Sequence, residues 1–341
     1  METRRSFIGK TAVAAGVAAI GGGRLFGRPV AHRATQSETP REVWLATVSQ
    51  HGLRAETPSQ MAQLIIDILA KSVAYRPDIV CLPEVFMTTY VSKKMTLSEK
   101  ADISDELLQE FSGYARQHRC YLICPTYTRE NGKTYNSAII FDREGGRMGE
   151  FRKIHLPDEE LELGLTPGPL HPPVFKTDFG TIGVQICYDL NWNDGWKSLR
   201  EQGAEIIFWP SAFAGGRAIN TKAWQNKVVV VSSTNKDTSK ICDITGETVA
   251  QTGVWDRHLI CAPVNLEKTF LHAWPFVRSF DDIRAKYGRK VRITNYHEEE
   301  WTVIESLSAD VRVKDVLTEF KIRTHEELMR DSTVKNANAR G

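Results

Sequence analysis

Hydrophobic positions in this chain fall into short apolar runs, separated by stretches in which apolar residues recur at helical spacing. The runs predict strands at residues 43–49, 78–82, 121–129, 137–142, 181–188, 205–210, 228–233 and 258–266. A hairpin is expected over 241–251, turning at Thr245-Gly246. Strands that alternate with helices through short loops indicate an α/β protein rather than a repeat or an all-β sandwich.

The helices are predicted from their capping residues as well as from their spacing. Thr57 followed by Pro58 is typical of a helix start, and the first helix is expected to run to about residue 73. Ser104 is the predicted cap of a second helix, whose apolar positions begin at Leu107. Two shorter helices are expected over 194–202 and 220–227.

The alternating pattern ends near residue 271, which divides the chain. We expect one domain over 43–271 and an ordered extension over 272–341. The extension lies outside the repeating pattern, but its charged and aromatic residues favour an ordered structure. From about Arg323 the chain becomes polar, which favours a frayed end.

Composition is that of a soluble globular protein, with 41% hydrophobic and 25% charged residues. The formal charge is +2, but residues 1–34 carry six basic residues and one acid. Without them the chain has 38 basic and 41 acidic residues. This balance gives no electrostatic argument for nucleic acid as a partner.

Residues 1–34 have the features of an export signal. Arg4-Arg5 precede Phe7, an uncharged small-residue stretch follows over 11–23, and a polar exit ends it. The stretch is shorter than the roughly 20 residues of a membrane span. The segment resembles a twin-arginine signal, which implies a periplasmic or extracellular protein cleaved between Ala31 and Ala34. A disordered basic arm is the alternative.

Six cysteines are present, and none forms a Cys-x-x-Cys pair. Most lie in apolar runs, which is typical of small buried hydrophobes rather than of a disulfide framework. The histidines and cysteines also lack the spacing of a zinc site. We therefore expect no metal and no cofactor.

Three short motifs place a polar side chain where a strand should end. They are Cys81-Leu82-Pro83-Glu84, Arg152-Lys153-Ile154-His155-Leu156-Pro157 and Gly183-Val184-Gln185-Ile186-Cys187-Tyr188-Asp189. A thiol is a nucleophile, a carboxylate can move its proton, and an ammonium can stabilise an oxyanion. Together they supply the parts for acyl transfer through a thioester.

The order, spacing and flanks of these motifs resemble the nitrilase superfamily of carbon–nitrogen hydrolases, over residues 43–266. The resemblance implies a four-layer α-β-β-α sandwich and a catalytic triad of Glu84, Lys153 and Cys187. Cys187 would be the nucleophile, Glu84 the general base, and Lys153 the cation that stabilises the oxyanion. The family also implies a homodimer or higher homo-oligomer, with the extension packed on a partner subunit.

Two supporting residues follow from the same resemblance. The backbone N–H of Tyr188 would assist Lys153 at the oxyanion. A second glutamate often follows the lysine loop in this family, and here Glu162 is favoured to orient Lys153, with Glu160 as the alternative. A plain acidic loop is the competing interpretation.

The substrate is expected to be a small molecule with an amide, N-carbamoyl or nitrile group. Tyr188-Asp189 resembles the amidase and carbamoylase branches more than the nitrile-hydrolysing one. A papain-like hydrolase and a metal-dependent hydrolase are poorly supported, since their local signatures are absent from the sequence. An inactive relative that serves as a binding module stays open, although all three catalytic positions are filled.

Overall fold

The computed structural model describes residues 39–341. The export signal expected at 1–34 lies outside the described residues and stays a prediction.

Two six-stranded sheets form the centre of the structure. The first has the order β12-β1-β2-β3-β4-β5, and the second has the order β11-β10-β9-β8-β7-β6. Strands of the first sheet are β1 (Glu42–Val48), β2 (Ile79–Cys81), β3 (Tyr121–Glu130), β4 (Lys133–Phe141), β5 (Arg147–Arg152) and β12 (Leu259–Asn265). Strands of the second are β6 (Phe175–Lys176), β7 (Thr181–Val184), β8 (Ile206–Ser211), β9 (Val229–Thr234), β10 (Lys240–Cys242) and β11 (Thr248–Gln251).

Each sheet has a parallel centre flanked by antiparallel strands. β1, β2 and β3 run parallel to one another, as do β7, β8 and β9. The carboxyl ends of parallel strands share one edge of their sheet, which is where α/β proteins commonly place functional side chains. The motifs with Glu84 and Cys187 follow β2 and β7, so both belong to such an edge.

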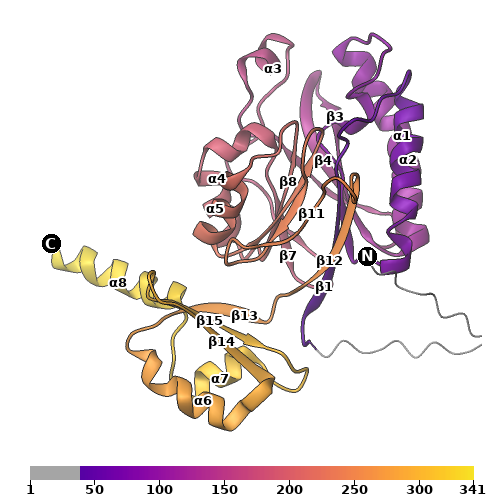
Figure 1. Ribbon diagram of the computed structural model, residues 1–341. Helices are drawn as coiled ribbons and strands as arrows, with labels where there is room; N and C mark the ends of the chain where they lie inside the picture. Colours follow the sequence, from indigo (N-terminus) through magenta and orange to yellow (C-terminus); the bar gives the residue numbers. More distant parts are fainter. Residues whose placement is uncertain (1–38) are drawn as a thin grey trace, which may run out of the picture. The chain divides into compact units, whose positions relative to one another are not determined.

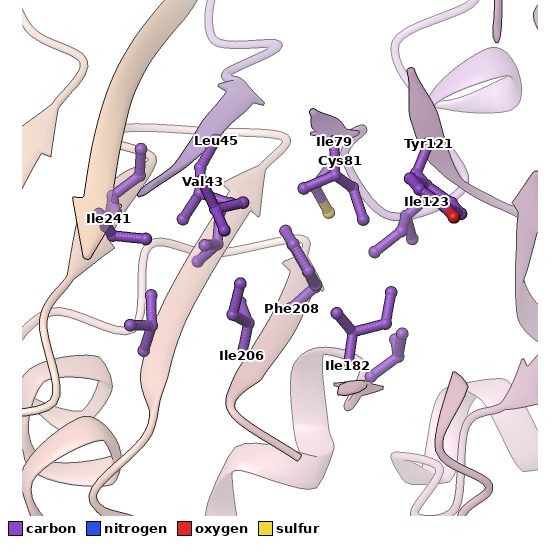
Figure 2. Close-up of a cluster of buried hydrophobic side chains, with 14 of the residues drawn as sticks. Val43, Leu45, Ile79, Cys81, Tyr121, Ile123, Ile182, Ile206, Phe208 and Ile241 are labelled. Atoms are coloured by element: carbon purple, nitrogen blue, oxygen red, sulfur yellow. The ribbon is translucent and has the colours of Figure 1, made fainter. Parts of the chain in front are cut away.

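The main hydrophobic core lies between the two sheets. Figure 2 shows side chains from β1, β2 and β3 facing side chains from β7, β8 and β10, among them Leu45, Ile123, Ile206, Phe208 and Ile241. These five are fully buried, and each such side chain stabilises the fold by about 1.5–3 kcal/mol. The continuous apolar runs of the sequence are therefore strands covered on both faces.

Helices cover the outer faces of both sheets (Figure 1). α1 (Pro58–Ala70) and α2 (Leu97–His118) pack on the first sheet, and α4 (Asp194–Glu201) and α5 (Arg217–Asn226) pack on the second. This arrangement confirms the predicted α-β-β-α sandwich. None of the helices formed by residues 39–341 combines the length and the apolar content that a membrane crossing would require.

The cap of α1 was predicted correctly, and that of α2 was not. Thr57 and Gln60 form a capping box at the start of α1. α2 begins at Leu97, because Thr96 and Glu99 form a second capping box, and Ser104 is buried within the helix. Two reciprocal side-chain bonds satisfy orphan N–H groups at Thr96, which a lone serine inside a helix could not do.

The C-terminal extension forms its own small sheet and core. β13 (Lys268–His272), β15 (Trp301–Ser306) and β14 (Val291–Tyr296) pair antiparallel in that order. Leu271, Phe280, Ile304 and Val316 belong to its hydrophobic cluster. The extension therefore starts at Lys268, four residues before the expected boundary at 272.

Three helices complete the extension: α6 (Phe280–Tyr287), α7 (Val313–Glu319) and α8 (His325–Ala339). The expectation of a frayed end after Arg323 is wrong, since Thr324 and Glu327 form a capping box that starts α8. The packing of the extension on a partner subunit stays a prediction.

Candidate active site

Glu84 lies three residues beyond the end of β2. Glu84 is 2% exposed, and the next residue, Val85, has a φ of 41° in the left-handed region that β-branched residues rarely adopt. Two bonds from the second sheet hold this segment. Ser233 Oγ donates to the carbonyl of Cys81 at 3.0 Å, and Asn235 Nδ2 donates to the carbonyl of Glu84 at 3.0 Å. The two sheets therefore fix Glu84 jointly.

Cys187 lies three residues beyond the end of β7, in a sharp turn. The strand ends at Val184, and a 3-10 helix (Cys187–Asn191) replaces the continuous strand predicted over 181–188. Cys187 has a φ of 47°, a strained conformation that proteins often reserve for functional residues. Its carbonyl accepts a hydrogen bond from Trp209 Nε1 at 3.0 Å. Its side chain is 8% exposed.

Lys153 directly follows β5. Its N–H donates to the carbonyl of Asn136 at 2.8 Å, and its own carbonyl accepts from the N–H of Gly168 at 2.7 Å. A Cβ at Gly168 would lie 2.4 Å from the carbonyl oxygen of Arg152, so this close approach requires glycine. The Pro167-Gly168 turn therefore packs closely against the backbone of Arg152 and Lys153 at the end of β5.

The ammonium of Lys153 lies between two carboxylates. Nζ is 2.9 Å from Glu84 Oε1 and 2.7 Å from Glu160 Oε1, and Lys153 is 1% exposed. Asn136 Nδ2 bridges the same two carboxylates, at 2.8 Å from Glu84 Oε1 and 3.4 Å from Glu160 Oε1. Asn136 lies on β4 and was not predicted as a site residue. Its only signal in the sequence is that it is a polar residue beside an apolar run.

The expectation that Glu162 orients Lys153 is wrong, and the alternative Glu160 occupies that position. Both residues belong to the short helix α3 (Asp158–Glu162). Residues two apart on a helix point to nearly opposite sides, so only one of them can face Lys153. Glu162 is exposed, whereas Glu160 reaches the buried ammonium.

Tyr188 directly follows Cys187 and is 38% exposed. Its ring packs edge-on against Trp192, at 5.2 Å between centroids. Trp192 also stacks on His155 at 3.9 Å. The aromatic side chains therefore lie beside the turn that carries Cys187, and the oxyanion role of the Tyr188 N–H stays a prediction.

Asp189 joins the cysteine turn to the lysine loop. Its Oδ1 accepts from the N–H of His155 at 2.7 Å, and its Oδ2 accepts from the N–H of Ile186 at 3.0 Å. The His155 ring nitrogen Nδ1 lies 3.0 Å from the same Oδ1. Asp189 is fully buried. The sequence carries a signal for this role, which is an acid two residues after the cysteine.

Charge and burial act in opposite directions on Lys153. Burial lowers the pKa of an amine, but the negative charges of Glu84 and Glu160 outweigh it and hold the pKa of Lys153 well above its usual value. Lys153 is therefore an ammonium throughout the physiological range. For Glu160, burial and the neighbouring Glu84 raise the pKa, although Lys153 and Asn136 oppose the shift.

Burial also raises the pKa of Cys187, and the charge of Glu84 adds to it, so that the thiol pKa reaches about 12. Lys153, the N–H of Ala212 and the hydroxyl of Ser211 favour the thiolate and oppose this shift. The resting thiol is therefore neutral at physiological pH. Glu84 Oε2 has no hydrogen-bond partner among residues 39–341, and a carboxylate oxygen of this kind can accept a proton.

Within residues 39–341, no group of three His, Cys, Asp or Glu side chains is arranged to hold a metal ion. The chemistry of the cluster is that of a thiol, two carboxylates and an ammonium.

Comparison with known proteins agrees with the family resemblance of the sequence motifs. Residues 45–270 match the family model for carbon-nitrogen hydrolases. The deaminated glutathione amidase of Synechocystis sp. is 28% identical over 169 residues, which cover 45% of this chain and 60% of that protein. The N-carbamoylputrescine amidase of Oryza sativa is 30% identical over 142 residues, which cover 40% of this chain and 47% of that protein. The chain thus spans about half the length of these relatives.

Solved structures share the fold. A carbon-nitrogen hydrolase from Helicobacter pylori aligns with a TM-score of 0.60 at 18% identity, over 73% of this chain and 94% of that one. An amidase from Nesterenkonia sp. aligns with a TM-score of 0.59 at 19% identity, over 67% of this chain and 91% of that one. At these identities the likeness shows the layered architecture alone.

Proposed function

This chain belongs to the carbon-nitrogen hydrolase family, and we propose that it hydrolyses an amide or N-carbamoyl bond of a small molecule through a thioester on Cys187. The observation that carries the proposal is the buried Lys153 ammonium, held by Glu84 and Glu160 and exerting its charge on Cys187.

In the first half of the reaction Glu84 takes the proton of the Cys187 thiol while the sulfur attacks the substrate carbonyl carbon. The negative charge that develops on the carbonyl oxygen is stabilised by the Lys153 ammonium and by the N–H of Tyr188. When the tetrahedral intermediate collapses, Glu84 returns its proton to the leaving nitrogen, and ammonia or an amine departs. The acyl group is left on Cys187 as a thioester.

In the second half Glu84 removes a proton from water, which attacks the thioester carbonyl. A second tetrahedral intermediate forms and collapses, and the sulfur leaves as the thiol after regaining a proton from Glu84. The product is a carboxylic acid from an amide, or a carbamic acid that releases carbon dioxide from an N-carbamoyl substrate. Glu160 and Asn136 keep Lys153 and Glu84 in place through both halves.

The relatives support this substrate class without assigning a substrate. The named similar proteins include amidases for deaminated glutathione and for N-carbamoylputrescine. A variant of the Nesterenkonia amidase, which shares the fold, carries the product of Michael addition of acrylamide on its active-site cysteine. The names of the relatives favour an amide-like substrate, and the adduct favours a reactive cysteine in a protein of this fold.

The experiment is a screen for ammonia and amine release across matched amides, N-carbamoyl amines and nitriles. We expect release from an amide or an N-carbamoyl amine and little from the matching nitrile. Cys187→Ala should abolish release, and Glu84→Gln should lower it by about 10²–10⁴-fold, because the amide side chain keeps its size but moves no proton.

Three results would count against the proposal. Faster turnover of a nitrile than of its amide would assign the chain to nitrile hydrolysis. Full activity in Cys187→Ala would remove the nucleophile. Inactivity of the wild-type protein on the whole panel, together with an unreactive Cys187 thiol, would support a binding module.

A further inference from the structure

A cavity of about 580 Å³ lies away from Cys187, between the second sheet and the C-terminal extension. None of its lining residues belongs to the Glu84, Lys153 and Cys187 cluster. Its walls include residues of α4, α7 and α8 and the β12–β13 connection. Its apolar floor is made of buried side chains, which are Ile244, Leu266, Phe270, Val313, Leu317 and Ile322.

The charged residues that line this cavity are unbalanced. Seven are basic and four are acidic, which leaves an excess of three positive charges. Three of the four carboxylates are paired with arginines, as Arg41–Glu205, Arg312–Glu267 and Arg200–Glu326. The fourth, Glu327, accepts hydrogen bonds from Thr324.

Three of the basic residues have no carboxylate partner. The side chains of Lys227, Lys314 and Lys321 make no hydrogen bond and no ion pair with any of residues 39–341. Lys314 and Lys321 are exposed at the rim. Lys227 is half-buried, and its Nζ lies 4.1 Å from the ring centroid of Trp301 and 5.6 Å from that of Phe270.

The surroundings of Lys227 disfavour its charge. Burial lowers its pKa to about 8, and Arg200 of α4 adds to the shift, while Glu326 of α8 opposes it. The neighbouring His325 is neutral near pH 7, because burial and Lys227 lower its pKa to about 4. The aromatic rings compensate an ammonium only in part, by about 0.5–2 kcal/mol. An anion beside Lys227 would supply the missing countercharge.

We propose that this cavity binds a small organic anion, whose carboxylate or phosphate group is held by Lys227, Lys314 and Lys321 and whose apolar part packs on the hydrophobic floor. The cavity volume lies in the range of small-molecule sites, which are mostly apolar with a few convergent polar groups. The site is separate from the catalytic centre and does not depend on the proposed reaction.

The test measures how fast each lysine of the intact protein reacts with trace acetic anhydride at pH 8, by peptide mass spectrometry. The probes are benzoate, which carries a carboxylate, and phenyl phosphate, which carries a phosphate. Sodium chloride at the same ionic strength controls for simple screening. Exposed Lys133 serves as the internal reference.

Without a probe, about half of the Lys227 amines would be neutral and reactive at pH 8. A bound anion moves the pKa of Lys227 back toward 10.5, so its acetylation should slow by roughly tenfold or more while that of Lys133 stays unchanged. The arm that protects better identifies the carboxylate or the phosphate as the preferred group. In the double variant Lys314→Gln, Lys321→Gln, protection should require several-fold more anion.

Two outcomes would overturn the proposal. In the first, both organic anions slow Lys227 no more than sodium chloride does. In the second, the double variant is protected at the same anion concentration as the wild type, so that the rim lysines play no part.

Discussion

Lys153 and Lys227 are two lysines withdrawn from water, and their pKa values shift in opposite directions. Lys153 is almost fully buried at the end of β5, yet its pKa is raised. Lys227 is only half-buried at the end of α5, yet its pKa is lowered to about 8. Burial alone would give Lys153 the lower pKa of the two.

The difference lies in the partners. Glu84 and Glu160 contact the Lys153 ammonium directly. Lys227 instead faces aromatic rings, and the nearby Glu326 is already paired with Arg200. A buried ammonium survives when carboxylates surround it and becomes marginal when they do not. Lys153 is therefore a permanent positive charge suited to an oxyanion, and Lys227 is a cation without a counterion.

The largest effect is expected from Lys153→Met, which removes the charge from the paired site. The rate should fall by about 10³-fold or more, because the oxyanion loses its principal stabiliser. The free energy of unfolding should also fall by roughly 3–5 kcal/mol, since two carboxylates are left buried without a cation. Steady-state kinetics and urea unfolding measure the two quantities.

Lys153→Arg separates the loss of charge from the loss of shape. The guanidinium keeps the positive charge, so the fold should be largely retained, but its planar fork cannot place the charge where the ammonium lies. A variant that folds and keeps more than about half of the wild-type rate would remove Lys153 from the mechanism.

A smaller effect is expected from Glu160→Gln, with Glu162→Gln as the matched control on the same helix. Glu160→Gln removes one of the two charges that hold Lys153, so the ammonium should be misplaced and the rate should fall by about 10-fold to 100-fold. Glu162 is exposed, so Glu162→Gln should leave the rate nearly unchanged. Equal rates in the two variants would contradict the assignment of Glu160.

The pH dependence gives a second readout for Glu160. Its pKa is raised, so its carboxylate is present above that value and is lost as the pH falls through it. The wild-type rate should fall in this range, because a protonated Glu160 no longer holds the Lys153 ammonium by its charge. Glu160→Gln should lack that part of the acid limb, which a pH–rate profile would show.

The smallest effect is expected from Lys227→Met, measured as stability in buffer without organic anions. The folded-state pKa of Lys227 lies below the unfolded value of 10.5, so the unfolded chain binds more protons between about pH 8 and 10.5. The charged lysine therefore destabilises the fold below pH 8, and this penalty disappears as the pH rises toward 10.5.

The methionine variant should accordingly be more stable than the wild type at pH 7, by roughly 1 kcal/mol. This figure is below the full conversion of the shift because solvent screens a half-buried group. The advantage should shrink at pH 10.5. A methionine variant that is less stable than wild type at pH 7 would show that the ring contacts outweigh the burial of charge.

Much of the sandwich could be predicted from the sequence because its strands are covered on both faces. Such strands leave uninterrupted apolar runs, and the runs ended close to Glu84 and Cys187. The start of α2 was missed because Thr96 carries a cap that only the Glu99 side chain completes. A capping box spans three residues, so a search for single cap residues does not reveal it.

The proximity of Glu84, Lys153 and Cys187 could be predicted because each of them follows a strand, but the residues that hold them could not. Their catalytic roles stay a prediction. Asn136 and Asp189 act through bonds to segments more than 30 residues away, to Glu84 and to His155. Glu160 and Glu162 differ only in which side of a five-residue helix they occupy. Local sequence patterns do not show which of two neighbouring side chains faces the site, because this depends on how the helix packs in the fold.

The central claim is that the Lys153 cluster makes Cys187 an acyl-transfer nucleophile. Cys261 is the natural comparison, because it is partly exposed whereas the other five cysteines are buried. The most direct measurement is acid quenching during turnover of a slow amide, followed by peptide mass mapping of the protein. We expect one acyl group, attached to Cys187, with Cys261 unmodified. An acyl group on Cys261, or turnover with no acyl group on Cys187, would contradict it.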